Sequence, residues 1–369
     1  MFVERGITTA QVAALMFTWS FVSFTLEIPT GALADRFGRR HMLAVAGPLR
    51  GLGYLVWWQF PSFRGYLVGF ILWGVESALT SGAFEALVYD ELQALRASNR
   101  YARVMGRATS LALGAQVVVG VAAAIAVRQG FDVVLLASAA ISSGAGLVAL
   151  LFPDARRADD VEREHYWALI RTGVGEVSRS PALRRLIFLS GVVLGFGAVD
   201  EFLGLVLREA GAGNASVGLW HSAFFVAGVA GSLVAHRSAR LQERALAIVA
   251  TVWAAALLLA AMLPYELAGI MLAAFTALFY FQRVALDARV QAAVSSRARA
   301  TVTSVEGLAA ELGALTAFAL FGAFADASSI RIATAMLGVV IVLAAAAFGV
   351  AVKRAAQTAP IPQFGRSRP

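Results

Sequence analysis

The sequence predicts an all-α membrane protein made of two helix bundles. Hydrophobic residues make up 59% of the 369 residues, charged residues make up 15%, and the charges lie between long apolar runs. A soluble domain carries about 25% charged residues, so this chain has too few to cover a water-exposed surface. The composition excludes a soluble enzyme and a disordered chain. The absence of cysteine excludes a disulfide scaffold and thiolate metal sites.

Eleven segments have the length and apolar character of membrane-spanning helices. An apolar helix needs about 20 residues to cross a bilayer. The predicted spans are 8–29, 42–60, 66–90, 104–127, 132–152, 184–207, 216–236, 245–263, 267–290, 300–323 and 331–352. The first six residues are too few and too polar to resemble a cleavable signal peptide.

The basic residues predict the orientation, because Arg and Lys concentrate in cytoplasmic loops. With loop 30–41 inside, most basic residues fall on the inner side, and the outer segments carry only Arg5, Arg64, Arg128, Arg208 and Arg331. We expect a bacterial inner-membrane protein whose N-terminus is outside and whose C-terminus is cytoplasmic. The net charge of +8 therefore reflects membrane topology. No nucleic-acid partner, metal or cofactor is expected.

The longest polar stretch, 153–183, divides the chain into two parts. It separates an N-terminal bundle of five spans (1–152) from a C-terminal bundle of six spans (184–352), and the tail 353–369 is expected to be disordered. Within the linker, apolar residues from Glu164 to Val177 recur near helical spacing. This pattern predicts an amphipathic helix lying on the inner membrane surface.

An internal repeat supports two similar halves. Residues 87–111 align without gaps with residues 284–308, and this alignment pairs Asp90 with Asp287. Two parallel halves joined by a polar loop are typical of secondary transporters.

The loop after the first span carries the most specific motif. It resembles the signature loop of the major facilitator superfamily, G-x-L-x-D-R-x-G-R-R, at every fixed position: Gly31, Leu33, Asp35, Arg36, Gly38, Arg39 and Arg40. The resemblance implies a transporter that works by alternating access of two bundles. It also implies a cytoplasmic latch, in which Asp35 faces the start of the helix near Ala300 and Arg39 pairs with Asp90. In the second half, Ala235 and His236 replace the motif's acidic and basic residues, so no equivalent latch is expected there.

The chain departs from this family in three ways. Family members have twelve spans, and their signature loop follows the second span, whereas here it follows the first. We therefore expect the natural protein to carry about 20–30 further residues before Met1, enough for one more span. The third span lacks the arginine of many proton-coupled members, and the fourth lacks the Gly-Pro motif of drug–proton antiporters. Both absences weaken an assignment to drug antiport.

Ionisable residues within the spans are the candidate site residues, because each costs about 2.5–3.5 kcal/mol at mid-bilayer. Arg50, Glu76 and Glu311 fall near the middle of their spans. Glu76 is the first choice for proton coupling, and a structural Arg50–Glu76 pair is the alternative. Candidates nearer the span ends, where snorkelling or interhelical pairing is the alternative, are Glu27, Glu85, Arg107, Asp200, Glu201, Arg283 and Glu306.

Aromatic and histidine side chains add weaker candidates. Phe279 and Tyr280 lie deep in the ninth span and are candidates for a substrate path. His221 is a candidate proton relay, although a lone membrane histidine is more often a hydrogen-bonded structural residue.

The predicted function is secondary transport of a small molecule by a monomer, as proton-coupled efflux of amphiphilic compounds. Uptake of a polar metabolite with protons is the alternative. An intramembrane hydrolase using Ser81 and His221 is a remote third possibility, because the sequence contains neither H-E-x-x-H nor G-x-S-x-G. A channel is disfavoured because no re-entrant filter sequence is present.

Overall fold

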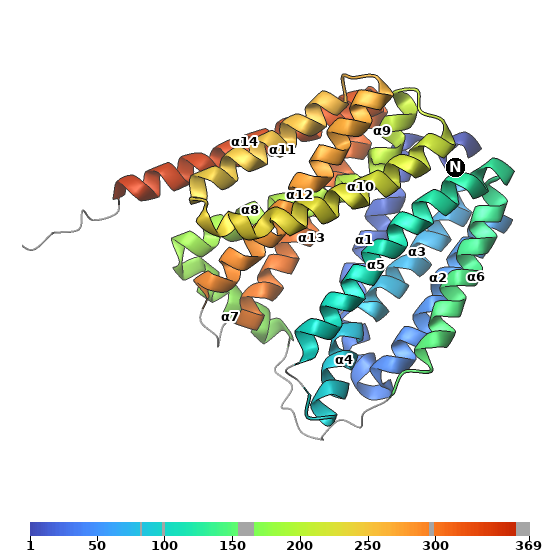
Figure 1. Ribbon diagram of the computed structural model, residues 1–369, viewed down its shortest axis with the longest axis horizontal. Helices are drawn as coiled ribbons and strands as arrows, with labels where there is room; N and C mark the ends of the chain where they lie inside the picture. The colour runs from blue at the N-terminus through green and yellow to red at the C-terminus, as the bar shows by residue number, and fades with distance from the viewer. Residues whose placement is uncertain (82, 98–99, 154–165, 295–298, 359–369) are drawn as a thin grey trace, which may run out of the picture.

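The computed structural model describes residues 1–81, 83–97, 100–153, 166–294 and 299–358, and within these ranges the chain is helical without strands. The helices form two bundles that meet near the N-terminus and diverge toward the other end of the molecule (Figure 1). The predicted all-α membrane fold is confirmed. The amphipathic-helix prediction begins at Glu164, outside the described residues, but α7 (Tyr166–Arg179) covers the rest of it.

The N-terminal bundle consists of the helices that precede the linker. After a short turn, η1 (Val3–Arg5), its elements are α1 (Thr9–Phe37), α2 (Arg39–Gln59), α3 (Phe63–Thr80), α4 (Ala83–Ala94), α5 (Tyr101–Ala126), η3 (Val127–Gln129) and α6 (Phe131–Ala149).

The C-terminal bundle follows α7. Its elements are α8 (Pro181–Phe196), η4 (Gly197–Phe202), α9 (Leu203–Glu209), α10 (Asn214–Val234), η5 (Ala235–Arg240), α11 (Glu243–Ala260), α12 (Tyr265–Ala293), α13 (Arg299–Ala327) and α14 (Ile330–Thr358). Helix α14 therefore continues into the segment expected to be a disordered tail. The remainder of that tail, 359–369, lies outside the described residues.

Ten segments of the described chain are long and apolar enough to cross a membrane, against eleven predicted. The segment not counted is α2, whose first turn contains Arg39, Arg40 and His41 and whose middle contains Arg50. Its 21 residues nevertheless span about 30 Å, and it packs against α6 and α3. Helix α2 is therefore an integral bundle helix, and its polar residues are accommodated by neighbouring helices.

Two predicted spans are interrupted. The third, 66–90, is divided between α3 and α4 near Ser81. The sixth, 184–207, changes from α to 3-10 geometry over η4 before α9 continues it. Short 3-10 stretches within a long helix often mark functional positions, and η4 carries both Asp200 and Glu201.

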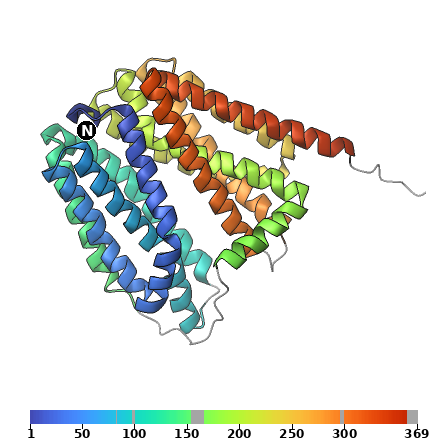
Figure 2. The ribbon, with the colours of Figure 1, turned by 180° about the vertical axis from the view of Figure 1, so that it is seen from behind.

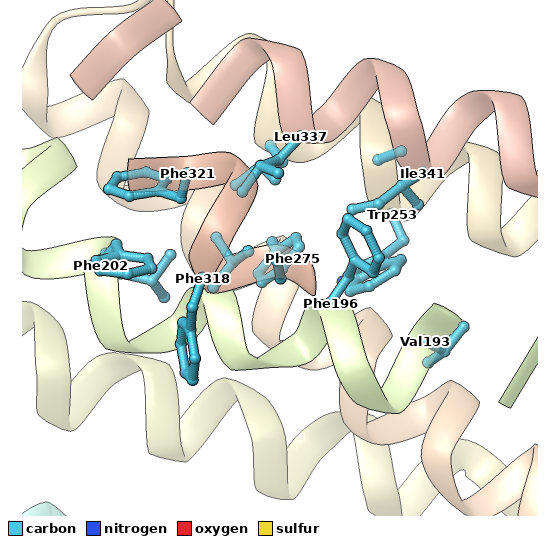
Figure 3. Close-up of a cluster of buried hydrophobic side chains, with 14 of the residues drawn as sticks. Val193, Phe196, Phe202, Trp253, Phe275, Phe318, Phe321, Leu337 and Ile341 are labelled. Carbon is cyan, nitrogen blue, oxygen red and sulfur yellow. The ribbon is translucent and has the colours of Figure 1, made fainter. Parts of the chain in front are cut away.

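The C-terminal bundle is held by a core of large aromatic side chains (Figure 3). Phe202 of η4 stacks on Phe321 of α13, with ring centroids 3.8 Å apart. Trp253 of α11 stacks on Phe275 of α12 at 4.9 Å. These contacts fix the interrupted helix α8–η4–α9 against its neighbours. Since Phe202 follows Glu201 directly, they also fix the position of the acidic pair.

Two helix pairs join the bundles, α1 with α13 and α5 with α10. Small residues lie at both crossings: Gly322 approaches Ala13, and Gly218 approaches Ala124. The Ser222 hydroxyl also donates to the Val117 carbonyl, 2.9 Å away. These contacts lie toward the end of the molecule that carries Met1. We call it the opposite end, because it lies opposite the end at which Arg39 and Arg40 begin α2.

The bundles are farther apart at the other end, which we call the basic end because Arg39 and Arg40 begin α2 there. The view from behind shows the same divergence (Figure 2). The structure is therefore closed at the opposite end and open at the basic end.

Candidate functional site

A central cavity of about 260 Å³ lies between the two bundles. The N-terminal bundle contributes Gln116 of α5. The C-terminal bundle contributes η4, α9, α10 and α12, through Asp200, Glu201, Leu203, His221, Phe224, Phe225, Thr276 and Tyr280. The cavity brings together two of the ionisable candidates, Asp200 and Glu201, with two of the weaker candidates, Tyr280 and His221.

Two adjacent carboxylates of η4, Asp200 and Glu201, line this cavity. Consecutive residues of a 3-10 helix point about 120° apart, so the two side chains reach the space in different directions. Gly197, the first residue of η4, lies against the Phe279 ring, where an added Cβ would collide. Gly197 thus leaves room for the Phe279 ring of α12 beside the acidic pair.

Glu201 also lines a second cavity. A space of about 630 Å³ toward the opposite end is lined by Glu201 together with residues that include Arg208 and Asn214. Glu4 closes part of this region, because its carboxylate accepts hydrogen bonds from Arg208 at 2.7 Å and Asn214 at 3.0 Å. Glu201 therefore lies between the central cavity and the closed end of the molecule.

The chemistry of the central cavity suits both protons and a polar or cationic group. Two carboxylates, an imidazole and a phenol can accept or donate protons, and Gln116 and Thr276 add neutral hydrogen-bonding groups. Aromatic rings form part of the wall, with His221 and Phe225 in edge contact at 5.0 Å. Carboxylates beside aromatic faces are the groups that recognise organic cations.

Glu76, the first choice for coupling, has a different environment. Its carboxylate lies 2.7 Å from the Arg50 guanidinium, and the residue is only 7% exposed. Arg50 also lies over the Trp73 ring at 5.1 Å. Glu76 is not among the residues that line the central cavity. The structure thus shows the ion pair within the N-terminal bundle that the sequence left open as the alternative.

Neutralising Glu76 is expected to lower stability. Glu76→Gln leaves Arg50 without its counter-charge inside the bundle, and breaking a buried pair costs about 3 kcal/mol at the low end of the usual range. The low end applies because the Arg50 side chain is 37% exposed. Thermal unfolding of the purified variant measures the loss, with the exposed Glu85→Gln as the matched control. Native stability together with a flattened pH profile of transport would instead identify Glu76 as a coupling residue.

Glu27 and Glu311 line a third space, a polar cavity of about 420 Å³ between α1 and α13 on the basic-end side of the crossing. The Ser81 hydroxyl donates to Glu27 at 3.3 Å. The Ser20 hydroxyl donates to Glu311 across the bundles. Glu306, on the same helix as Glu311, is instead 5% exposed and does not line this cavity.

The signature loop turns sharply between α1 and α2. Gly38 has φ of +88°, a conformation that favours glycine. Arg39 donates to the Asp90 carboxylate, and Arg40 donates to the Phe152 carbonyl at 3.3 Å. The Arg39–Asp90 ion pair joins α2 to α4 inside one bundle. Leu33 is exposed, Gly31 has open space around it, and the side chains of Asp35 and Arg36 lie outside the described part of the structure.

Asp35→Asn is expected to impair transport by about 5–150-fold, the range of a coupling free energy of 1–3 kcal/mol. In the predicted latch, Asp35 stabilises the state closed at the basic end, so its neutralisation favours the open state seen here. Initial transport rates at equal expression measure the effect, and the exposed Glu85→Gln in α4 serves as a control in the same bundle. A native rate in Asp35→Asn would reject the latch.

Sequence reasoning missed Gln116, Thr276, Phe224 and Phe225. A lone amide within an apolar span is a detectable signal for Gln116, since uncompensated polar groups are costly in a bilayer. Thr276 and the phenylalanines give no such signal, because threonine and phenylalanine are common in any membrane helix.

The comparisons with known proteins agree with this architecture. A family model described as the Major Facilitator Superfamily matches residues 1–209. No curated protein matches the chain.

Solved structures of transporters share the fold at low sequence identity. The nucleoside transporter NupG is 13% identical with a TM-score of 0.74, covering 96% of this chain and 93% of its own. A D-xylose-proton symporter is 14% identical with a TM-score of 0.70, covering 94% and 90%. A bacterial homologue of the human lysosomal transporter Spinster, inward-facing and occupied, is 16% identical with a TM-score of 0.63, covering 95% and 94%. The chain is a multi-pass membrane protein that belongs to the Major Facilitator Superfamily, a family of secondary transporters and not of enzymes.

Proposed function

We propose that this protein exports small amphiphilic compounds that carry a positive charge, in exchange for protons, and that Asp200 and Glu201 bind both. The observation that carries the proposal is the pair of adjacent carboxylates on η4 that faces an aromatic cavity between the bundles. A proton and a cationic group compete for the same carboxylates, and such competition couples their movements in opposite directions. The lining residues His221 and Tyr280 add proton-bearing groups within the same space.

The shape of the molecule supports alternating access. Two helix pairs join the bundles, and both make their close contacts toward the opposite end. Rocking about these contacts closes the basic end and opens the other. In the orientation that the basic residues predict, the basic end is cytoplasmic, and the conformation described here is inward-open in a bacterial inner membrane. In this state the central cavity accepts substrate from the cytoplasm or inner leaflet. The protein is proposed to act as a monomer, since each chain contains both bundles.

Transport by purified protein in liposomes tests the proposal. Cationic amphiphiles are expected to move out of the compartment on the basic side when a proton gradient is imposed in the opposite direction. A protonophore should abolish this movement. Transport that persists with a protonophore, or uptake driven by protons in the same direction, would contradict the proposed exchange.

Proton-coupled uptake of a polar metabolite is the second candidate function. Gln116, Thr276 and Tyr280 can hydrogen-bond a neutral polar solute, and they lie in the same cavity as the carboxylates. Structures with this fold include a nucleoside transporter and a D-xylose-proton symporter. Counterflow in liposomes with no proton gradient, comparing nucleosides and sugars with cationic amphiphiles, separates the two candidates.

A further inference from the structure

A groove at the basic end of the C-terminal bundle combines positive charge with apolar walls. It has a volume of about 340 Å³ and lies between the start of α8 and the last turns of α14. Helix α8 contributes Pro181, Arg184, Arg185 and Phe188, and α14 contributes Ala347, Phe348 and Ala351. It is separate from the central cavity and shares no lining residue with it.

The helical spacing places charge and apolar surface on the same face. On α8, Arg184 and Arg185 lie three and four residues after Pro181 and four and three residues before Phe188. Residues at these spacings share one side of a helix. On α14, alanines at 347 and 351 leave room beside Phe348. Phe188 remains 47% exposed, although it lies in a bundle helix. The groove is therefore open to the surrounding lipid.

The charges in the groove are only partly neutralised. Arg185 contacts the Glu243 carboxylate at 3.3 Å, and Arg184 donates to the Ser178 carbonyl at 3.0 Å. The start of α8 adds the positive end of a helix dipole. Lys353 adds a further positive charge on α14 just beyond Ala351. Among the described residues that line the groove, two are arginines and none is acidic, so the lining carries a net positive charge.

We propose that this groove binds an anionic phospholipid, with the headgroup phosphate at Arg184 and Arg185 and an acyl chain against Phe188 and Phe348. A lipid fits the groove better than a free phosphate does, because the groove combines cations with apolar walls and a free phosphate would contact only the cations. Basic pockets between transmembrane helices on the cytoplasmic side are suited to anionic headgroups. The lipid connects α8 to α14 at the end where the bundles separate.

Lipid binding by the purified full chain tests the proposal through two variants that act differently. Arg184→Gln removes one phosphate contact, and Arg184 is exposed, so the fold is retained. Ala351→Phe fills the groove and leaves every charge in place. The exposed Arg103→Gln, at the same end on α5, is the matched control. Binding is measured by native mass spectrometry with phosphatidylglycerol and with phosphatidylcholine, and the thermal shift is recorded in parallel.

The wild type is expected to prefer phosphatidylglycerol. Arg184→Gln should lower that preference about fivefold, the factor for one basic residue at an anionic membrane. Ala351→Phe should lower binding of the lipid. Inorganic phosphate should not stabilise either the wild type or Ala351→Phe. An unchanged preference in both variants would overturn the proposal. Stabilisation by inorganic phosphate equal to that by the lipid would show a free-anion site and overturn it as well.

Discussion

A Glu201→Gln variant is expected to lose proton-driven transport by about 5–150-fold, the range of a coupling free energy of 1–3 kcal/mol. Glutamine keeps the volume of the side chain but has neither a titratable proton nor a negative charge that attracts a cation. The effect is expected to be large because Glu201 lines both the central cavity and the space that leads to the opposite end.

Transport in liposomes, measured with and without an imposed proton gradient, checks this expectation. Glu266→Gln is the matched control, because Glu266 is exposed in the first turn of α12 and lines no part of the central cavity. Asp200→Asn distinguishes the two acidic residues: if Asp200 alone carries the proton, Asp200→Asn fails and Glu201→Gln transports normally. A native rate in both variants would reject the acidic pair as the coupling site.

Gly120→Val is expected to shift the protein away from the conformation described here. An added Cβ at Gly120 would collide with the Ser222 hydroxyl and approach the Gly218 carbonyl to 3.1 Å. The collision forces α5 from α10 at the closed end, and overpacking of this kind costs about 1–3 kcal/mol. The state closed at the opposite end should lose about 5–150-fold in relative population.

Distances between spin labels on introduced cysteines measure this shift. The chain has no cysteine, so pairs of introduced cysteines report distances between spin labels without background. Gly114→Val is the control on the same helix, because a Cβ there meets no other atom within 4 Å. If the two valine variants give the same distance distributions, the α5–α10 crossing does not stabilise the closed end.

The long apolar runs of the sequence predict the helices, but they do not predict where two of the helices are interrupted. The break near Ser81 and the 3-10 segment η4 lie within two segments, Phe63–Ala94 and Pro181–Glu209, that are each apolar enough on average to be counted as one span, so mean hydropathy carries no sign of them. The consequence for the site is direct. The sequence placed Asp200 and Glu201 near a span end, where snorkelling was the alternative, whereas η4 turns both toward the central cavity.

The ranking of the charged residues was less predictable than their presence. Depth along a span can be estimated by counting residues, and it places Arg50, Glu76 and Glu311 alike near mid-span. The preference for Glu76 rests on the family resemblance, which implies that the third span lines the cavity. Which side of the helix faces a cavity depends on the neighbouring helices, and α3 turns Glu76 toward Arg50 of α2. The signature loop was recognisable because its glycines and charges meet local requirements, such as the positive φ of Gly38.

The divergence of the two bundles also has a mechanical consequence for the bilayer. A molecule that is closed at one end and open at the other occupies a larger area in one leaflet than in the other (Figure 1). Reversal of this wedge during transport transfers area between the leaflets, and work is done against lateral pressure. Lipids that raise the pressure in the leaflet at the basic end therefore oppose the conformation described here, whatever the substrate. Membrane curvature and headgroup size thus become effectors of the transport cycle, acting without any binding site.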